Sequence, residues 1–108
     1  MKVRFKNTDT ALTCTDPVEQ KLFRSGVPYG WAIMFHIEAD VTSSDVDKLI
    51  TPENIEELEF TNDEAVIGVV TGYSAIANCV IRHKADKTVV ELQFTKTDAS
   101  AEKNNSAK

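Results

Sequence analysis

The stretch Trp31-Ala32-Ile33-Met34-Phe35-His36-Ile37-Glu38 predicts the central β-strand of the protein. Apolar residues occupy every second position from Trp31 to Ile37, and this period of two places them on one face of a strand. The intervening residues are also apolar as far as Phe35, which is typical of a strand with partial cover on both faces. We therefore expect the rest of the fold to pair with this segment.

Segments on both sides of this strand alternate in the same way and predict antiparallel neighbours for it. Residues 2–6 alternate apolar and basic positions, and turn residues after them allow residues 11–15 to return as a hairpin. Gly68 and Gly72 suit a bulge or a bend in the second half of the chain. That half is predicted to form a meander of strands at residues 57–61, 66–70, 73–83 and 88–96.

Residues 16–24 fit two structures. Asp16 and the proline after it suit the start of a helix, and Val18 and Leu22 are four apart on one helical face. The same two side chains would also share one face of a strand. We favour the strand, because a short helix here would have little apolar area to hold it in place. The two glycines and one proline in residues 25–30 predict a turn or loop before the central strand.

A short helix is predicted at residues 43–50. Thr42 resembles an N-cap, and Val46, Leu49 and Ile50 have the spacing of one helical face. Thr51 followed by proline repeats the start signal and indicates one further helical turn. The predicted fold is therefore α+β, a mostly antiparallel β-sheet of about six or seven strands with one short helix near residues 43–50.

A length of 108 residues suits one domain. The hydrophobic fraction of 42% and charged fraction of 27% are ordinary for a globular protein. Residues 97–108 contain no large apolar side chain, so burial cannot offset the entropy of ordering them. We expect a single β-rich domain at residues 1–96 and a flexible polar tail at residues 97–108.

The composition also argues against several classes of function. The longest apolar run, residues 31–35, is far shorter than the roughly 20 residues of a membrane span, and no signal peptide is recognised at the N-terminus. A net charge of −5 disfavours a general nucleic-acid binder, because phosphates attract basic surfaces. We therefore expect a cytoplasmic protein that binds neither membrane nor nucleic acid, with its two cysteines as buried free thiols.

The acidic residues are concentrated in one part of the sequence and form the first candidate site. No Lys or Arg lies between Leu49 and Ile81, while basic residues gather in the first strand. Such a cluster is either a solvated face or a surface for a protein partner. Tyr29, next to a loop, has even odds of being a partner anchor or a core residue, whereas Trp31 is expected in the core. The candidate partner-binding residues are Tyr29, Glu53, Glu56, Glu57, Glu59, Asp63 and Glu64.

A second candidate is a groove near Met34, His36 and Glu38, where the histidine and the carboxylate could act as an acid/base pair. The competing interpretation is a polar position between strands, which we favour. The set of Cys14, His36, Cys79 and His83 contains zinc-ligand types, but it lacks the close ligand pairs of zinc sites. No metal, cofactor or catalytic residue is therefore predicted.

Three segments resemble small β-rich proteins of phages and integrated prophages. They are Glu19-Gln20-Lys21-Leu22-Phe23, Gly30-Trp31, and residues 49–55 followed by a closing hairpin. The resemblance spans residues 1–96 and implies a structural or accessory part of a particle or tail, without assigning a functional residue.

Two main hypotheses of function follow. The first is a non-enzymatic interaction or assembly module that associates through sheet edges and opposed charged surfaces, with itself or with another protein. The alternative is a small-ligand-binding protein or enzyme that uses the groove near His36 and Glu38. A regulatory role, in which the acidic region binds a host protein, is not separable from the first hypothesis by sequence.

Overall fold

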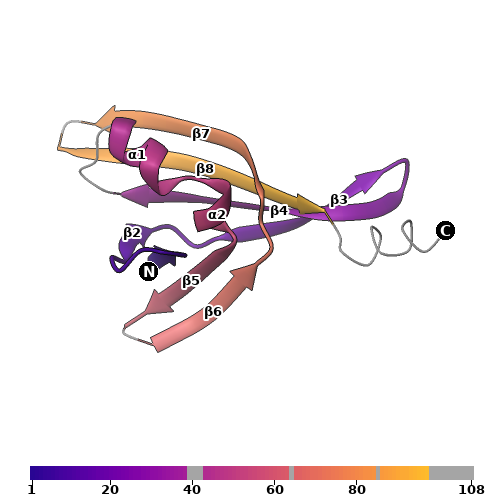
Figure 1. Ribbon diagram of the computed structural model, residues 1–108, viewed down its shortest axis with the longest axis horizontal. Coiled ribbons are helices and arrows are strands. Elements are labelled where there is room, and N and C mark those ends of the chain that lie inside the picture. The colour runs from indigo at the N-terminus through magenta and orange to yellow at the C-terminus, as the bar shows by residue number, and fades with distance from the viewer. Residues whose placement is uncertain (39–42, 64, 85, 98–108) are drawn as a thin grey trace.

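Residues 1–38, 43–63, 65–84 and 86–97 are described in a computed structural model, and they form eight β-strands and two short α-helices (Figure 1). Every strand pair is antiparallel, which confirms the predicted fold class, although the strand count exceeds the predicted six or seven. In chain order the elements are β1 (Lys2–Phe5), β2 (Leu12–Cys14), β3 (Val18–Arg24), β4 (Val27–Glu38), α1 (Ser43–Leu49), α2 (Pro52–Ile55), β5 (Glu57–Asn62), β6 (Ala65–Thr71), β7 (Ala75–Lys84) and β8 (Lys87–Thr97).

The sheet has the order β6-β5-β1-β2-β4-β8-β7, and β3 pairs with β4 off this path. The predicted central strand is confirmed as part of β4, which is the longest strand and pairs with β8 from Gly30 to Glu38. The predicted hairpin of residues 2–6 and 11–15 is confirmed as the β1–β2 pair. β4 is therefore a central strand of the sheet, with β2 and β3 on one side and β8 on the other, as the alternation of its side chains predicts.

Strands β2 and β3 follow one another along the same edge of β4. Cys14 lies opposite Ile37 and Val18 opposite Met34, so the β2–β3 side has one residue more than β4 between these pairs. In this bulge the amide of Thr15 donates to the His36 carbonyl at 2.9 Å, and the His36 amide donates to Thr15 Oγ1 at 2.9 Å. The preference for a strand in residues 16–24 is confirmed from Val18 onward, and this strand accounts for the higher count.

The predicted turn or loop at residues 25–30 is confirmed as a turn, but its length is wrong, because only Ser25 and Gly26 lie between β3 and β4. Both have positive φ, 51° and 79°, as a tight two-residue hairpin turn requires. Pro28 lies inside β4 at a position that pairs with β3 alone, so its missing N–H removes no bond on the other side. We name the hairpin of residues 18–29 the arm; its base pairs along β4, and its tip projects beyond the body of the sheet (Figure 1).

The helices link the central strand to β5. α1 and α2 confirm the predicted short helix near residues 43–50 and the further turn after it. Thr51 is the N-cap of α2, where the Asn54 amide donates to Thr51 Oγ1 at 3.2 Å. The Asn54 side chain in turn donates to the Leu49 carbonyl at 2.9 Å and so satisfies the end of α1. The predicted cap Thr42 lies outside the described residues.

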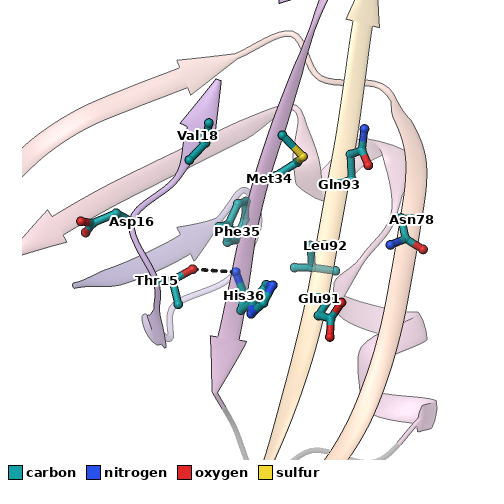
Figure 2. Close-up of a pocket in the computed structure, with 10 residues that line it drawn as sticks. All are labelled: Thr15, Asp16, Val18, Met34, Phe35, His36, Asn78, Glu91, Leu92 and Gln93. Atoms are coloured by element: carbon teal, nitrogen blue, oxygen red, sulfur yellow. Dashed lines mark hydrogen bonds between the residues drawn. The ribbon is translucent and has the colours of Figure 1, made fainter. Parts of the chain in front are cut away.

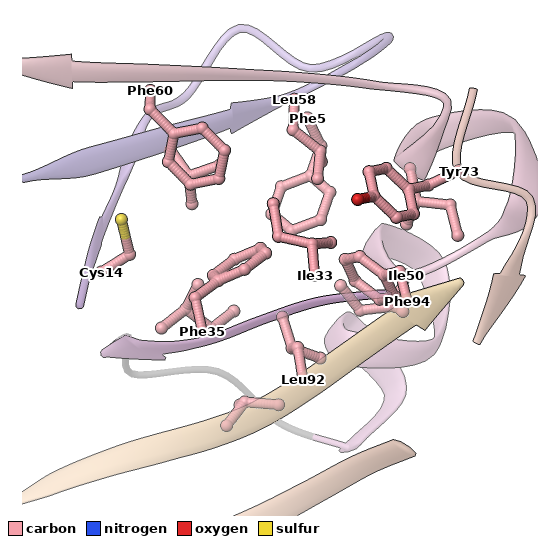
Figure 3. Close-up of a cluster of buried hydrophobic side chains, with 14 of the residues drawn as sticks. Phe5, Cys14, Ile33, Phe35, Ile50, Leu58, Phe60, Tyr73, Leu92 and Phe94 are labelled. Carbon is pink, nitrogen blue, oxygen red and sulfur yellow. The ribbon is translucent and has the colours of Figure 1, made fainter. Parts of the chain in front are cut away.

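The core lies on the concave side of the sheet, between β1 and β5 on one side and β4 and β8 on the other (Figure 3). Four phenylalanines from these strands meet there. The ring centroid of Phe35 lies 5.4 Å from that of Phe60 and 5.8 Å from that of Phe94. Both pairs are edge-to-face, which adds about 0.5–1.5 kcal/mol per pair beyond area burial. Val46 and Ile55 from the helices are fully buried and close one end of this core.

A short link joins the two outermost strands of the sheet. Only Gly72, Tyr73 and Ser74 separate β6 from β7, so the sheet must curl until these strands approach each other. Gly72 has φ 92°, which confirms the predicted bend, and Gly68 lies beside the register shift between β5 and β6. Tyr73, which sequence alternation places in a strand, instead lies before β7 and is fully buried.

β8 ends at Thr97, and residues 98–108 of the predicted tail lie outside the described part of the chain. None of the described helices has the length and apolar character needed to cross a membrane.

Candidate interaction site

The described acidic residues lie between the start of α2 and the turn after β5, and two of them pair with basic residues in or directly after β1. Glu56 lies 3.2 Å from Lys6 Nζ, and Glu59 lies 3.1 Å from Arg4 Nη2. These exposed pairs contribute little stability, but they neutralise part of the cluster. The sequence predicts that these opposed charges bind a partner, but at these two positions the acidic and basic side chains form ion pairs with each other within the chain. Glu53, Glu57 and Asp63 are exposed, and Glu64 lies outside the described residues.

Tyr29 does not join the acidic residues, because it lies on the arm. The guanidinium of Arg24 is 4.8 Å from the centroid of its ring, and the side chain is half-buried. Trp31 is also half-buried and packs against the core, with Lys21 Nζ 5.1 Å from its ring centroid. Both aromatic rings therefore contact basic side chains of β3. The predicted partner-binding set lies in two separate places, Tyr29 on the arm and the described acidic residues around α2 and β5 (Figure 1).

The least protected surface is the edge formed by β6. We name Ala65–Thr71 the β6 edge; within the described chain this strand pairs only with β5, and it contains no charged residue. Three of its side chains are exposed although they are large and apolar, Val66 at 58%, Ile67 at 55% and Val69 at 48%. Unpaired backbone groups beside exposed apolar side chains are a template for another strand.

The strand at the other end of the sheet path, β7, carries the usual protection against such pairing. β7 has a register shift between Ile76 and Asn78 and places Arg82 and Lys84 near its end. β3 contains two basic residues and one acidic residue. Charges and bulges on an edge strand oppose unwanted pairing. The β6 edge has a bulge but no charged residue of its own, and at its end Lys96 Nζ of β8 donates to the Thr71 carbonyl at 2.7 Å. The sequence patterns do not identify this site. The signal that could have indicated it is the absence of charged residues from Ala65 to Thr71, a segment that the alternation pattern predicts only as a strand.

A cleft of about 390 Å³ lies on the outer face of the sheet, opposite the core (Figure 2). Met34 and His36, two of the three predicted groove residues, line it, while Glu38 does not. Glu38 instead accepts from Lys87 Nζ at 2.7 Å, and this hydrogen bond lowers the pKa of the carboxyl. We name this the outer cleft; it is lined by Thr15, Asp16, Val18, Met34, Phe35, His36, Asn78, Glu91, Leu92 and Gln93.

Two of the polar side chains that line the outer cleft already form a hydrogen bond or an ion pair with neighbouring residues. Glu91 lies opposite His36 in the β4–β8 ladder and forms an ion pair with Arg82 of β7. Thr15 Oγ1 accepts from the backbone of His36, so its oxygen is engaged. No lining residue pairs a Ser or Cys nucleophile with a base. The arrangement is suited to binding through amide and thioether groups, from Asn78 and Met34 for example, more than to acid/base chemistry.

The cysteines lie on different strands and are both free thiols. Cys14 is buried in the core, and burial raises the pKa of its thiol to about 11. Cys79 on β7 is exposed, so the prediction that both are buried is wrong for this residue. Partial burial and the charge of Asp47 raise its pKa. Across the described ranges, no group of three or more His, Cys, Asp or Glu residues is placed to hold a metal ion.

Comparison of the chain with protein-family models, with curated proteins and with solved structures finds no match. The function is therefore argued from the geometry of the β6 edge and the outer cleft.

Proposed function

We propose that this protein is a non-enzymatic assembly module whose copies associate along the β6 edge. The observation that carries the proposal is the exposure of Val66, Ile67 and Val69 on an uncharged strand that, among the described residues, has a neighbouring strand on one side only. A strand from another copy would satisfy the outward backbone groups and cover the apolar side chains in one contact.

The energetics support a weak and reversible contact. Fully burying a Val or Ile side chain contributes about 1.5–3 kcal/mol, and the three side chains of the β6 edge are already half covered. Ordering and lost freedom oppose this gain, so an interface of one strand belongs to the small, transient class. Association is then expected only at high concentration, as suits a part that works in an array of copies. The resemblance to small phage proteins agrees with such a role.

Sedimentation velocity over a range of protein concentrations tests the proposal. The wild type is expected to sediment faster as concentration rises, and Val66→Lys/Val69→Lys is expected to remain monomeric because two ammonium groups then line the edge. Ile76→Lys is the matched control, since Ile76 is also an exposed hydrophobic residue on an outer strand. A wild type that stays monomeric throughout, or an equal effect of the control, would contradict the proposal.

A second candidate function, binding of a small ligand, is favoured by one observation, the outer cleft. Its volume of about 390 Å³ falls in the usual range for ligand sites, and it combines the apolar Val18 and Met34 with the amides of Asn78 and Gln93. Ligand-observed NMR with a fragment library would test it. Fragments that bind the wild type should be lost with His36→Ala and kept with Glu38→Ala, because only His36 lines the cleft. Equal binding by both variants would remove the cleft as the site.

A further inference from the structure

Most of the large apolar side chains exposed in the described chain fall into two groups, one on the β6 edge and one on the arm. Of the seven large hydrophobic residues exposed in the described chain, three lie on the β6 edge and Ile76 lies on β7. The remaining three lie on the arm, where Phe23 is 60% and Val27 is 62% exposed, together with Val18. One β6 edge meeting another would cover only the first group.

The tip of the arm extends past the rest of the sheet, where another copy could contact it (Figure 1). Pairing between β4 and β8 begins at Gly30, so residues 27–29, next to the hairpin tip, pair with β3 alone (Figure 1). The long axis of the molecule is 53 Å against 28 and 23 Å for the others, and Figure 1 shows the arm pointing along it. The outer edge of β3 pairs with no strand in the portion described.

The arm is also held in one conformation before any contact. Its turn is the tight Ser25-Gly26 turn, and Arg24 covers the ring of Tyr29. At its base the hydroxyl of the buried Tyr73 donates to Glu19 Oε2 at 2.7 Å, which ties β3 to the link between β6 and β7. A segment that is ordered in advance loses less entropy on binding.

We propose that the arm of one copy docks on the β6 edge of the next copy, so that β3 extends the sheet beyond β6. The inference rests on the proposed function and names the strand that the β6 edge takes. Both strands have seven residues, and each carries exposed apolar side chains.

Charge favours the same pair of surfaces. The arm is basic, because it carries Lys21 and Arg24 against a single acidic residue, Glu19. The β6 edge is flanked by acidic residues, Asp63 in the turn before it and Glu57 opposite Thr71. Opposite charges at the ends of an apolar contact steer the two surfaces and set their orientation.

Because the two surfaces differ, the contact is head-to-tail. Each copy has one arm to donate and one β6 edge to accept, and such contacts close into a ring or continue into a filament. This predicts a behaviour that a symmetric dimer cannot show. Two variants that each fail to assemble, for opposite reasons, should rescue one another as a pair.

The test mixes a variant with a defective arm, Phe23→Ser/Val27→Ser, and the variant with a defective edge, Val66→Lys/Val69→Lys. All four side chains are exposed, so both variants are expected to fold, which circular dichroism and thermal unfolding would check. Alone, each should self-associate at least about tenfold more weakly than the wild type, a loss of about 1.4 kcal/mol in association free energy. Mixed in equal amounts, they should form a 1:1 heterodimer by native mass spectrometry and nothing larger.

Each alternative result separates the two proposals. If the arm variant assembles like the wild type while the edge variant does not, the copies pair β6 to β6, and the inference falls while the proposed function stands. A mixture that remains monomeric also overturns the inference. If the wild type never associates, both fall.

A cross-linking measurement keeps the test valid where a variant misfolds. In a Cys79→Ser background, copies carrying Phe23→Cys are mixed with copies carrying Ile67→Cys and then oxidised. Disulfides should join position 23 to position 67, and a product dominated by 67–67 links would contradict head-to-tail docking.

Discussion

Replacing Gly30 with alanine should destabilise the protein strongly, because Gly30 lies where the arm leaves the sheet and two strands approach closely. A Cβ atom there would overlap the carbonyl oxygen of Lys96 and lie 3.2 Å from its carbon and 3.3 Å from the Cα of Thr97. These are backbone atoms of β8, whose position is set by the ladder with β4. No side-chain rotation can relieve the overlap, so one of the strands must move.

The cost can be estimated from the kind of atom in the way. Overpacking costs about 1–3 kcal/mol and occasionally more, and contact with paired backbone places this case near about 3 kcal/mol. For a domain of this size, 1 kcal/mol lowers the Tm by roughly 4–8 °C, so a fall of roughly 12–24 °C is expected. The assay is thermal unfolding followed by circular dichroism.

Gly68→Ala is the matched control for this prediction. A Cβ at Gly68 meets nothing within 4 Å, although this glycine also lies in a strand. The change should leave the Tm unaltered or raise it, because alanine reduces the entropy of the unfolded chain by about 0.4–1 kcal/mol. A Gly30→Ala protein that melts with the wild type would refute the close approach of β4 and β8.

Two further predictions concern Tyr73 and the cysteines. Burial first, and then the bond to Glu19, raise the pKa of Tyr73 above its ordinary value of 10.0, so the unfolded chain ionises first. The resulting stability is complete below about pH 10 and declines as pH rises further; Tyr73→Phe should lower the Tm at neutral pH and lose stability less steeply above about pH 10. Iodoacetamide should modify the exposed Cys79 in the native protein and Cys14 only after unfolding, as mass spectrometry would show; rapid native labelling of Cys14 would contradict its burial.

Much of the fold could be predicted because its signals are local. The alternation around Phe35 predicts β4, and Thr51 with Pro52 predicts the start of α2 from residues a few positions apart. The start of β4 at Val27 differs from the prediction, because the glycines and the proline of residues 25–30 together indicate a longer turn or loop. Only the strand order shows that Pro28 has a neighbour on one side, where a missing N–H does no harm.

The candidate sites depend on contacts that no local pattern contains. Arg4 meets Glu59 across 55 positions of sequence, so the pairing of two opposed charges depends on the β1–β5 register. Alternation places Met34 and His36 on one face of a strand, but the cleft beside them also needs Asn78 of β7 and the bulge before Val18. Whether a strand such as β6 is central or at an edge is likewise set by the strand order alone.

Amide hydrogen exchange of β6, compared at low and high protein concentration, tests most directly whether its free edge is the surface on which copies assemble. Half of the amides in a strand with one neighbour point outward, and these exchange freely until another strand pairs with them. Outward amides of Ala65–Thr71 should exchange more slowly at high concentration, while those of Ala75–Lys84 on the β7 edge stay unchanged. Exchange in β6 that is independent of concentration, or slowed exchange confined to β7, would contradict the account.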